Sequence, residues 1–364
     1  MDQTRFLRFI CTFLSLLCVF AVVTAFKTLS SVFMPLIVAI LLALVFYPLC
    51  KKLNKLKIPW ILCVLIIIIT AYILLYIVGQ ILVSSLTTVI NSYPKYESRF
   101  TSIYQTICDT FSIDYDEETS LLSNMWNSLN IRQVIQKGML SFSSVLMSFG
   151  KQLMLISLFI AFLLIEIPTL GKKTDLIFEE QDKRGKVRDM ARKTVSEVTH
   201  YISIKFLISL ITGILVGFST FIIKMDFPVI WGFMAFILNF IPSFGSIISW
   251  GLTTLFALLQ FYPNWGYIIY VAIMVLSINM ILGNVVEPRW EGSDLGISPF
   301  MILVSLSFFG WLWGFVGMIM AVPCMVIIKI ICENTNELKA IAILMGNGTP
   351  SKKMKNIKKN KEEQ

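Results

Sequence analysis

Two long stretches of the chain carry no charge at all. No Asp, Glu, Lys, Arg or His occurs from Phe227 to Val286 or from Leu295 to Ile328. A bilayer core of about 30 Å is crossed by about 20 apolar residues in a helix, and several runs reach that length. Charged residues make up only 15% of the chain, against about 25% in an ordinary soluble domain. The sequence therefore predicts an all-α polytopic membrane protein.

The amino-terminal segment, 1–83, is predicted to contain three membrane helices, at about 9–26, 32–50 and 59–83. The first apolar run has features of a signal peptide, but a second run begins almost at once, so we interpret it as an uncleaved helix. The connection 51–57 carries four lysines and no acid, and the positive-inside rule places it in the cytoplasm. The amino terminus is then cytoplasmic and the third helix leads outward.

Polar segments separate the remaining spans. In the insert 84–148, apolar residues recur at helical spacing, which predicts amphipathic helices outside the membrane or along its outer surface. A fourth span at 149–167 returns the chain inward to a basic, mostly helical cytoplasmic segment at 168–200. The basic tail, 332–364, is also expected in the cytoplasm. In the basic segment 168–200, charges of both signs alternate and no aromatic side chains are placed to stack on bases, so we expect no nucleic-acid binding.

The predicted transport core, 201–331, begins with a fifth span at 201–223 and continues with two apolar segments that glycine and proline interrupt. Lipid offers no water to the backbone freed at such a break, which is tolerated only beside protein or a water-filled cavity. Interrupted segments of this kind point to the binding region of a transporter, and the alternative is a pair of kinked helices packed by small residues. The residues expected at breaks and turns are Pro242, Gly245, Pro263, Pro288, Gly292, Gly296, Pro299, Gly310, Gly314, Gly317 and Pro323.

Two topologies fit the interrupted segments, 229–260 and 299–330. In one, each segment crosses the membrane once and the "EPR" sequence between them lies outside. In the other, both are re-entrant hairpins that return to the face they left, and "EPR" starts from the cytoplasmic side. We favour the hairpins because each interruption falls near the middle of its segment. The architecture then has about eight membrane segments, two of them broken hairpins, with both termini cytoplasmic.

The stretch "VVEPRWEGSDLGISP", 285–299, gathers charges between the two apolar runs. Proline disfavours helix at the residue before it, so we expect Pro288 to turn the chain at Glu287 and to begin a compact loop. Such a loop could present Glu287 and Arg289 to a solute or a coupling cation, and the alternative is a plain interfacial loop. The other candidates for a solute or ion pathway are Asn239, Asn279 and Asn284, which could equally join helices.

Several functional classes leave no trace in the sequence. It contains no His-Glu-x-x-His, no G-x-S-x-G and no nucleotide-binding motif, so we expect neither an enzyme nor direct use of ATP. The seven cysteines show no paired spacing and the single His200 flanks an apolar run, so we expect no metal and no cofactor. The expected partners are the lipid bilayer, a small polar solute and a coupling proton or sodium ion, and a homo-oligomer stays open.

The sequence "NVVEPRWEGSDLGISPFMILVSLSFFGWLWGFVGMIMAVP", 284–323, resembles the signature of the autoinducer-2 exporter family, the PerM-like permeases. "NFIPSFGSII" resembles that family's proline–glycine motif, although Ser246 stands where a second proline is frequent. The resemblance implies about eight membrane helices in the bacterial cytoplasmic membrane and a secondary transporter that exports a small polar signal such as autoinducer-2.

Two alternatives to export remain. Some relatives of the family that the chain resembles are associated with sodium–proton antiport, so the resemblance also allows a cation antiporter. A membrane scaffold without transport activity would instead use the insert 84–148 and the basic segment 168–200 as docking surfaces for partner proteins.

Overall fold

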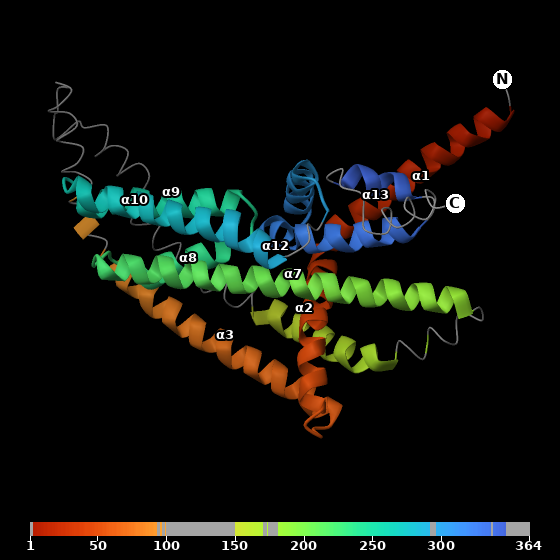
Figure 1. Cartoon of the computed structure of the whole chain (residues 1–364), viewed down its shortest axis with the longest axis horizontal. Helices are drawn as coiled ribbons and strands as arrows, with labels where there is room; N and C mark the ends of the chain where they lie inside the picture. The colour runs from red at the N-terminus through yellow and green to blue at the C-terminus, as the bar shows by residue number, and fades with distance from the viewer. Residues whose placement is uncertain are drawn as a thin grey trace, which may run out of the picture. The chain divides into compact units, whose positions relative to one another are not determined.

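The computed structural model describes residues 3–92, 95–96, 99, 150–169, 173, 181–291, 296–335 and 338–346. Within these residues every named element is a helix, and the only β feature is an isolated bridge between Ile297 and Gly346 (Figure 1). This confirms the all-α prediction. Most of the predicted insert, 84–148, lies outside the described residues.

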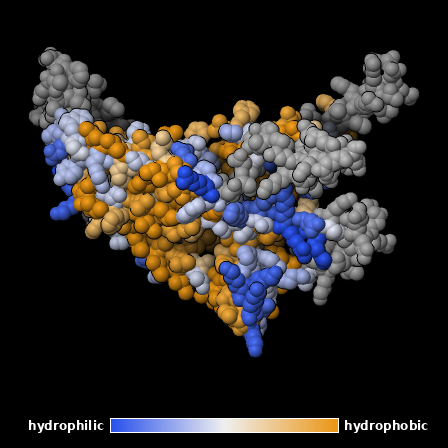
Figure 2. Space-filling view, viewed as in Figure 1, coloured by the Kyte–Doolittle hydropathy of each residue, from blue (hydrophilic) through white to orange (hydrophobic). Residues whose placement is uncertain are grey.

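Long apolar helices dominate the described part of the chain. Many of their large apolar side chains are exposed, among them Phe20 and Tyr76, and Figure 2 shows hydrophobic side chains over broad areas. Exposed apolar surface of this extent suits a lipid environment, which confirms the polytopic membrane class. Among the described residues, seven helices are long and apolar enough to cross a membrane: Ser30–Asn54, Trp60–Ser85, Gly150–Thr169, Val187–Ile222, Phe244–Phe261, Trp265–Trp290 and Pro299–Asn334.

The chain divides into two compact units, each assembled from distant stretches of sequence. Unit 1 comprises residues 1–64, 155–200 and 294–364, and unit 2 comprises residues 65–154 and 201–293. Unit 1 contains α1 (Gln3–Thr28), α2 (Ser30–Asn54), α12 (Pro299–Asn334) and α13 (Lys339–Met345). Unit 2 contains α8 (Pro228–Leu238), α9 (Phe244–Phe261), α10 (Trp265–Ile281), the π-helix η1 (Leu282–Val286) and α11 (Glu287–Glu291). Helices α3 (Trp60–Asn91) and α7 (Gln181–Ile222) contribute residues to both units.

In unit 1, α12 is a helical hairpin. The backbone leaves the helical region at Trp313 and Gly314, where Gly314 adopts a left-handed φ of 63° that favours glycine. A Cβ atom on Gly317 would lie 1.9 Å from the carbonyl oxygen of Phe309, so the two halves fold back on each other. The predicted break within 299–330 is therefore confirmed. Pro323 lies inside the second half of the hairpin, which continues to Asn334.

Contacts at the two ends of this hairpin fix its place in unit 1. At its beginning, the amide of Ser298 donates to the carbonyl of Met345 in α13 at 2.9 Å. At its turn, the Trp313 indole donates to the carbonyl of Phe26 at 3.4 Å, and the Lys27 ammonium lies 3.5 Å from the centroid of the Trp311 ring. The turn of the α12 hairpin thus lies against the corner between α1 and α2.

In unit 2, α7 and α8 approach each other closely at glycines. A Cβ atom on Gly232 of α8 would lie 2.7 Å from the carbonyl oxygen of Gly213 and 3.1 Å from the Cα atom of Gly217, both in α7. Any larger side chain at Gly232 would have to push the two helices apart. Small residues with four-residue spacing, as at Gly213 and Gly217, are a common basis for close helix packing in membranes.

Helices α8 and α9 form the second hairpin. Its turn covers Asn239 to Ser243, and a Cβ atom on Gly245 would lie 1.7 Å from the carbonyl oxygen of Leu238, so the reversal requires glycine there. The predicted break at Pro242 and Gly245 is confirmed. Pro263, predicted as a second interruption, lies in the turn between α9 and α10.

The prediction for Glu287 and Pro288 was wrong. Helix α10 continues through η1 into α11, and Glu287 has helical dihedral angles, φ −54° and ψ −53°. A proline is tolerated in the first turn of a helix, where its missing N–H has no partner within the helix, and the π-helix shifts the register directly before it. The turn comes later: Gly296 has a φ of 64°, and Pro299 begins α12. Gly292 lies outside the described residues.

Candidate functional site

Polar side chains are buried in the interior of unit 2, although its helices are almost entirely apolar. Four of them belong to α7, and Lys205, Ser209 and Thr212, at spacings of four and three residues, lie on one face of the helix. Buried polar groups in a membrane protein usually bond to one another or mark a pathway for solute or ions. The set consists of Lys205, Ser209, Thr212 and Thr220 of α7, Asn239 at the end of α8, and Ser249, Thr253 and Gln260 of α9.

Lys205 and Glu287 form an ion pair inside this region. The Lys205 ammonium lies 2.5 Å from the Glu287 carboxylate, and the two side chains are only 7% and 14% exposed. Removing two charges from water is costly, and their mutual attraction offsets that cost only at close range. Lys205 was not predicted as a candidate from the sequence. It is the only charged residue between His200 and Lys224, and a solitary charge within an apolar helix indicates a functional site.

Asn239 and Ser209 make the next polar contact along α7. The Asn239 amide donates to the Ser209 hydroxyl at 3.1 Å, and both residues are buried. Ser209 lies four residues after Lys205, so the two contacts are about one helical turn apart. The Asn239 bond fastens the turn of the α8–α9 hairpin to α7, and the ion pair fastens α11 to the same helix.

The geometry of α7 gives the depth of both contacts. Ser209 lies thirteen residues before Ile222, the end of α7, which corresponds to about 20 Å at about 1.5 Å per residue. Lys205 lies seventeen residues before Ile222, or about 26 Å. Both ends of the α8–α9 hairpin lie near Ile222, because the Asp226 amide donates to the Gln260 side chain at 2.8 Å. The ion pair therefore lies about one turn beyond the tip of the hairpin.

The other predicted candidates lie outside this polar region. The Asn279 amide donates to the carbonyl of Ser246 at 3.4 Å and so joins α10 to α9. The exposed Asn284 lies 3.2 Å from the Met280 sulfur within its own helical segment. Arg289 is exposed, and the cation beside Glu287 is Lys205 instead. Of the predicted pathway residues, Asn239, which is buried, and Glu287, which is largely buried, contact the polar side chains of α7.

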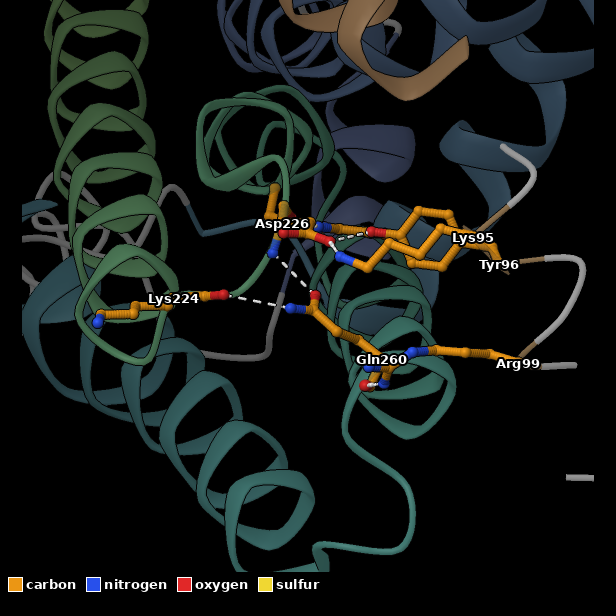
Figure 3. Close-up of polar contacts among 7 residues, drawn as sticks. Lys95, Tyr96, Arg99, Lys224, Asp226 and Gln260 are labelled. Atoms are coloured by element: carbon orange, nitrogen blue, oxygen red, sulfur yellow. Dashed lines mark hydrogen bonds and ion pairs between the residues drawn. The ribbon is translucent and has the colours of Figure 1, made fainter. Parts of the chain in front are cut away.

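A second polar cluster lies beyond the carboxyl end of α7, and Figure 3 shows its side chains meeting between the α7–α8 loop and the last turn of α9. The Asp226 carboxylate accepts hydrogen bonds from Lys95, at 2.7 Å, and from the Tyr96 hydroxyl. The Gln260 amide donates to the carbonyl of Lys224 at 3.2 Å, and the Gln260 backbone carbonyl accepts from Arg99 (Figure 3). The cluster thus ties Lys95, Tyr96 and Arg99 to the α7–α8 loop and to the end of α9.

The contacts of Asp226 shift two pKa values in this cluster. Burial alone would raise the pKa of Asp226, but the hydrogen bonds from Lys95 and Tyr96 and the charges of Lys95 and Arg99 outweigh it, so this pKa is lowered. Burial raises the pKa of Tyr96, and the hydrogen bond to Asp226 and its negative charge raise it further. Near neutral pH the carboxylate is therefore charged and the phenol keeps its proton. Across the described residues, no three His, Cys, Asp or Glu side chains gather as a metal site.

Comparisons with known proteins agree on one family. A family profile described as AI-2E family transporter matches residues 12–337. The chain is 32% identical to a "Putative transport protein" of Borreliella burgdorferi, over 88% of this chain and 86% of that protein. It is 29% identical to the AI-2 transport protein TqsA of Escherichia coli over 87% and 90%, and 27% identical to a "Putative transport protein" of Haemophilus influenzae over 92% and 96%.

Proposed function

The chain belongs to the AI-2E family of transporters, and from this membership we propose that it is a secondary permease that exports a small polar solute of the autoinducer-2 type. It is a multi-pass membrane transporter of a bacterial family. The likeness to TqsA supports autoinducer-2 as the first solute to test. The gradient of the solute itself, or of a coupling ion, supplies the driving force, since the sequence has no nucleotide-binding motif.

The observation that carries the proposal is the α8–α9 hairpin. Its two ends lie together near Asp226, and its turn brings Asn239 into the apolar interior beside Ser209. A backbone that reverses at such a depth has to be lined by protein or water, which is how transporters build their binding sites. The hydroxyl of Ser249 in α9 is also buried and has no hydrogen-bond partner among the described groups. We therefore assign the passage of the solute to the polar face of α7 and the turn of this hairpin.

From the contacts of the α12 hairpin we also propose on which side of the membrane its two ends lie. Glu333, at the end of the α12 hairpin, pairs at 3.0 Å with Lys193, which belongs to the predicted cytoplasmic segment. The beginning of the same hairpin contacts α13, which follows its end by a few residues. Both ends of α12 then lie on the cytoplasmic side, and so does the "EPR" sequence. Labelling of a Ser293→Cys variant from the outer face alone would contradict this re-entrant topology.

The proposed export is tested with purified protein in liposomes loaded with autoinducer-2. We expect efflux above that of protein-free liposomes, and we expect Asn239→Ala to lower it at least about fivefold, because a buried partner of Ser209 is removed. The matched control is Asn264→Ala, at the exposed turn between α9 and α10, which should transport as the unaltered protein does. Both variants must first elute as folded protein in detergent.

The same liposomes distinguish the alternatives. Sodium-dependent proton movement without autoinducer-2 efflux would replace the export proposal with cation antiport. Activity in neither assay, from protein that is folded and correctly inserted, would favour a scaffold for partner proteins. Equal loss in Asn239→Ala and Asn264→Ala would show that the assignment to the hairpin turn is wrong even if export occurs.

A further inference from the structure

In the proposed passage past the α8–α9 turn, the Lys205–Glu287 ion pair is the next polar contact along α7. Asn239 is bonded to Ser209 about 20 Å along α7 from Ile222, and a bilayer core is about 30 Å thick. The pair lies one turn further along α7, toward the basic segment that the positive-inside rule assigns to the cytoplasm. Any solute that reaches Ser209 from the cytoplasm on this face of α7 has to pass the pair.

We propose that Lys205 and Glu287 form an inner gate: while paired, they separate the polar residues at the hairpin turn from the cytoplasm, and their separation opens that route. Lys205 is thereby a positioning residue, because it acts by holding α11 against α7. The inference rests on the proposed function only for what passes through the gate. The closing of the gate by this pair can be tested without transport, by measuring how fast a cysteine near the hairpin turn is labelled from the cytoplasm.

The surroundings of the pair explain why charge, rather than apolar packing, would close this route. The apolar cluster beside it contains Ile204, Ile208 and Leu282. In such surroundings two opposite charges attract strongly, yet a polar solute or water can take the place of either partner as they separate. An apolar seal would offer a polar solute no such replacement. A structural clamp between α7 and α11 is the competing explanation.

The π-helix before Glu287 supports movement at this position. Residues Leu282–Val286 adopt the wider turn, and the amide of Glu287 donates to the carbonyl of Leu282, five residues earlier. π-helical turns are rare and occur frequently at functional sites. Pro288 follows directly and has no N–H to donate to the turn before it. Glu287 therefore sits at a weak point of an otherwise continuous helix, where a small change of register can withdraw its carboxylate.

The test measures access to a cysteine at position 209. Ser209→Cys is made in a background without the native cysteines, and membrane-impermeant methanethiosulfonate reagent is applied to membranes from the cytoplasmic side or the outer side. With the pair intact we expect slow labelling from the cytoplasm. In Lys205→Ala/Glu287→Ala, we expect cytoplasmic labelling to be at least about tenfold faster, because the closed state no longer holds the larger population. The matched control, Lys95→Ala/Asp226→Ala, removes the Lys95–Asp226 ion pair instead. It should leave the rate of labelling from the cytoplasm unchanged.

Further variants separate a gate from a clamp. Exchanging the charges, Lys205→Glu/Glu287→Lys, should restore slow labelling, since the attraction is kept. If the double alanine variant does not fold, Lys205→Gln/Glu287→Gln serves in its place, with the same expected rise in labelling from the cytoplasm. Labelling at one rate with and without the pair, or a rise that is equal from both faces, would overturn the inner gate while leaving the proposed export untouched.

Discussion

The described part of unit 2 holds two lysine–carboxylate ion pairs in different surroundings. Lys95 and Asp226 meet at the loops that flank the α8–α9 hairpin, with side chains 50% and 30% exposed, whereas Lys205 and Glu287 meet beyond the hairpin turn at 7% and 14%. Water already solvates the first pair, so separating it costs little. The second pair has only its partner, so breaking it leaves an uncompensated buried charge. Depth therefore decides which lysine–carboxylate contact holds the helices of this unit together.

The largest effect is expected when one member of the buried pair is removed. Glu287→Leu should lower the free energy of unfolding by about 3–5 kcal/mol, because Lys205 is left buried without a counter-charge. Lys205→Met/Glu287→Leu should regain most of the loss, since both charges are gone. Thermal unfolding of the detergent-solubilised variants measures both values. A single variant as stable as the unaltered protein would erase the contrast between the two pairs.

A smaller effect is expected at the exposed pair. Asp226→Ala removes the acceptor for Lys95 and Tyr96, but both donors can turn to water. We expect a loss of about 1–2 kcal/mol, from an exposed ion pair worth about 0.2–1 kcal/mol and one further hydrogen bond worth about 0.5–1.5 kcal/mol. The same unfolding assay measures it. A loss as large as that of Glu287→Leu would mean that exposure is not what distinguishes the pairs.

The pH dependence of stability should report on the polar cluster around Asp226. The pKa of Asp226 is lowered in the folded protein, so its contribution is present above the unfolded pKa of about 4 and is lost as pH falls through the folded value. The pKa of Tyr96 is raised, so its contribution is present below about 10 and is lost as pH rises through the folded value. Melting curves between pH 7 and 3 should fall less steeply for Asp226→Asn than for the unaltered protein. Parallel curves would contradict this assignment.

Salt should give the smallest difference. The Debye length shortens from about 8 Å at 0.15 M to about 3 Å at 1 M, which screens exposed charges and hardly affects buried ones. The destabilisation caused by Asp226→Ala should therefore shrink by a few tenths of a kcal/mol, roughly the scale of exposed pairs, at 1 M salt. That of Glu287→Leu should stay constant. Equal salt dependence would indicate that water reaches both pairs alike.

The breaks in the helices could be predicted from sequence because their causes are local. Gly245 and Gly314 stand where a close backbone approach or a left-handed φ excludes other residues, and both features belong to glycine itself. The prediction of a turn at Pro288 was wrong for an equally local reason. Proline disfavours helix at the residue before it, but the π-helix ends directly before Glu287, so Pro288 lies in the first turn of α11, where proline is tolerated.

The pairing at the candidate site could not be predicted in the same way. Glu287 was predicted as a candidate because it lies among the charges gathered between the two apolar runs, but its partner Lys205 lies 82 residues away and meets it only because α7 and α11 pack together. Arg289 looked equally suitable in the sequence and is exposed. The polar cluster around Asp226 was not predicted for the same reason, since Asp226 and Gln260 become neighbours only in the folded α8–α9 hairpin.

The bond from the Ser298 amide to the Met345 carbonyl has a practical consequence for anyone who modifies the chain. The predicted basic tail begins at residue 332, and within it Lys339–Met345 is a helix whose end accepts a hydrogen bond from the start of the α12 hairpin. A purification handle or fluorescent reporter joined ahead of Met345 would take that anchor away. Joined after Gly346, it would leave the hairpin's starting point secured.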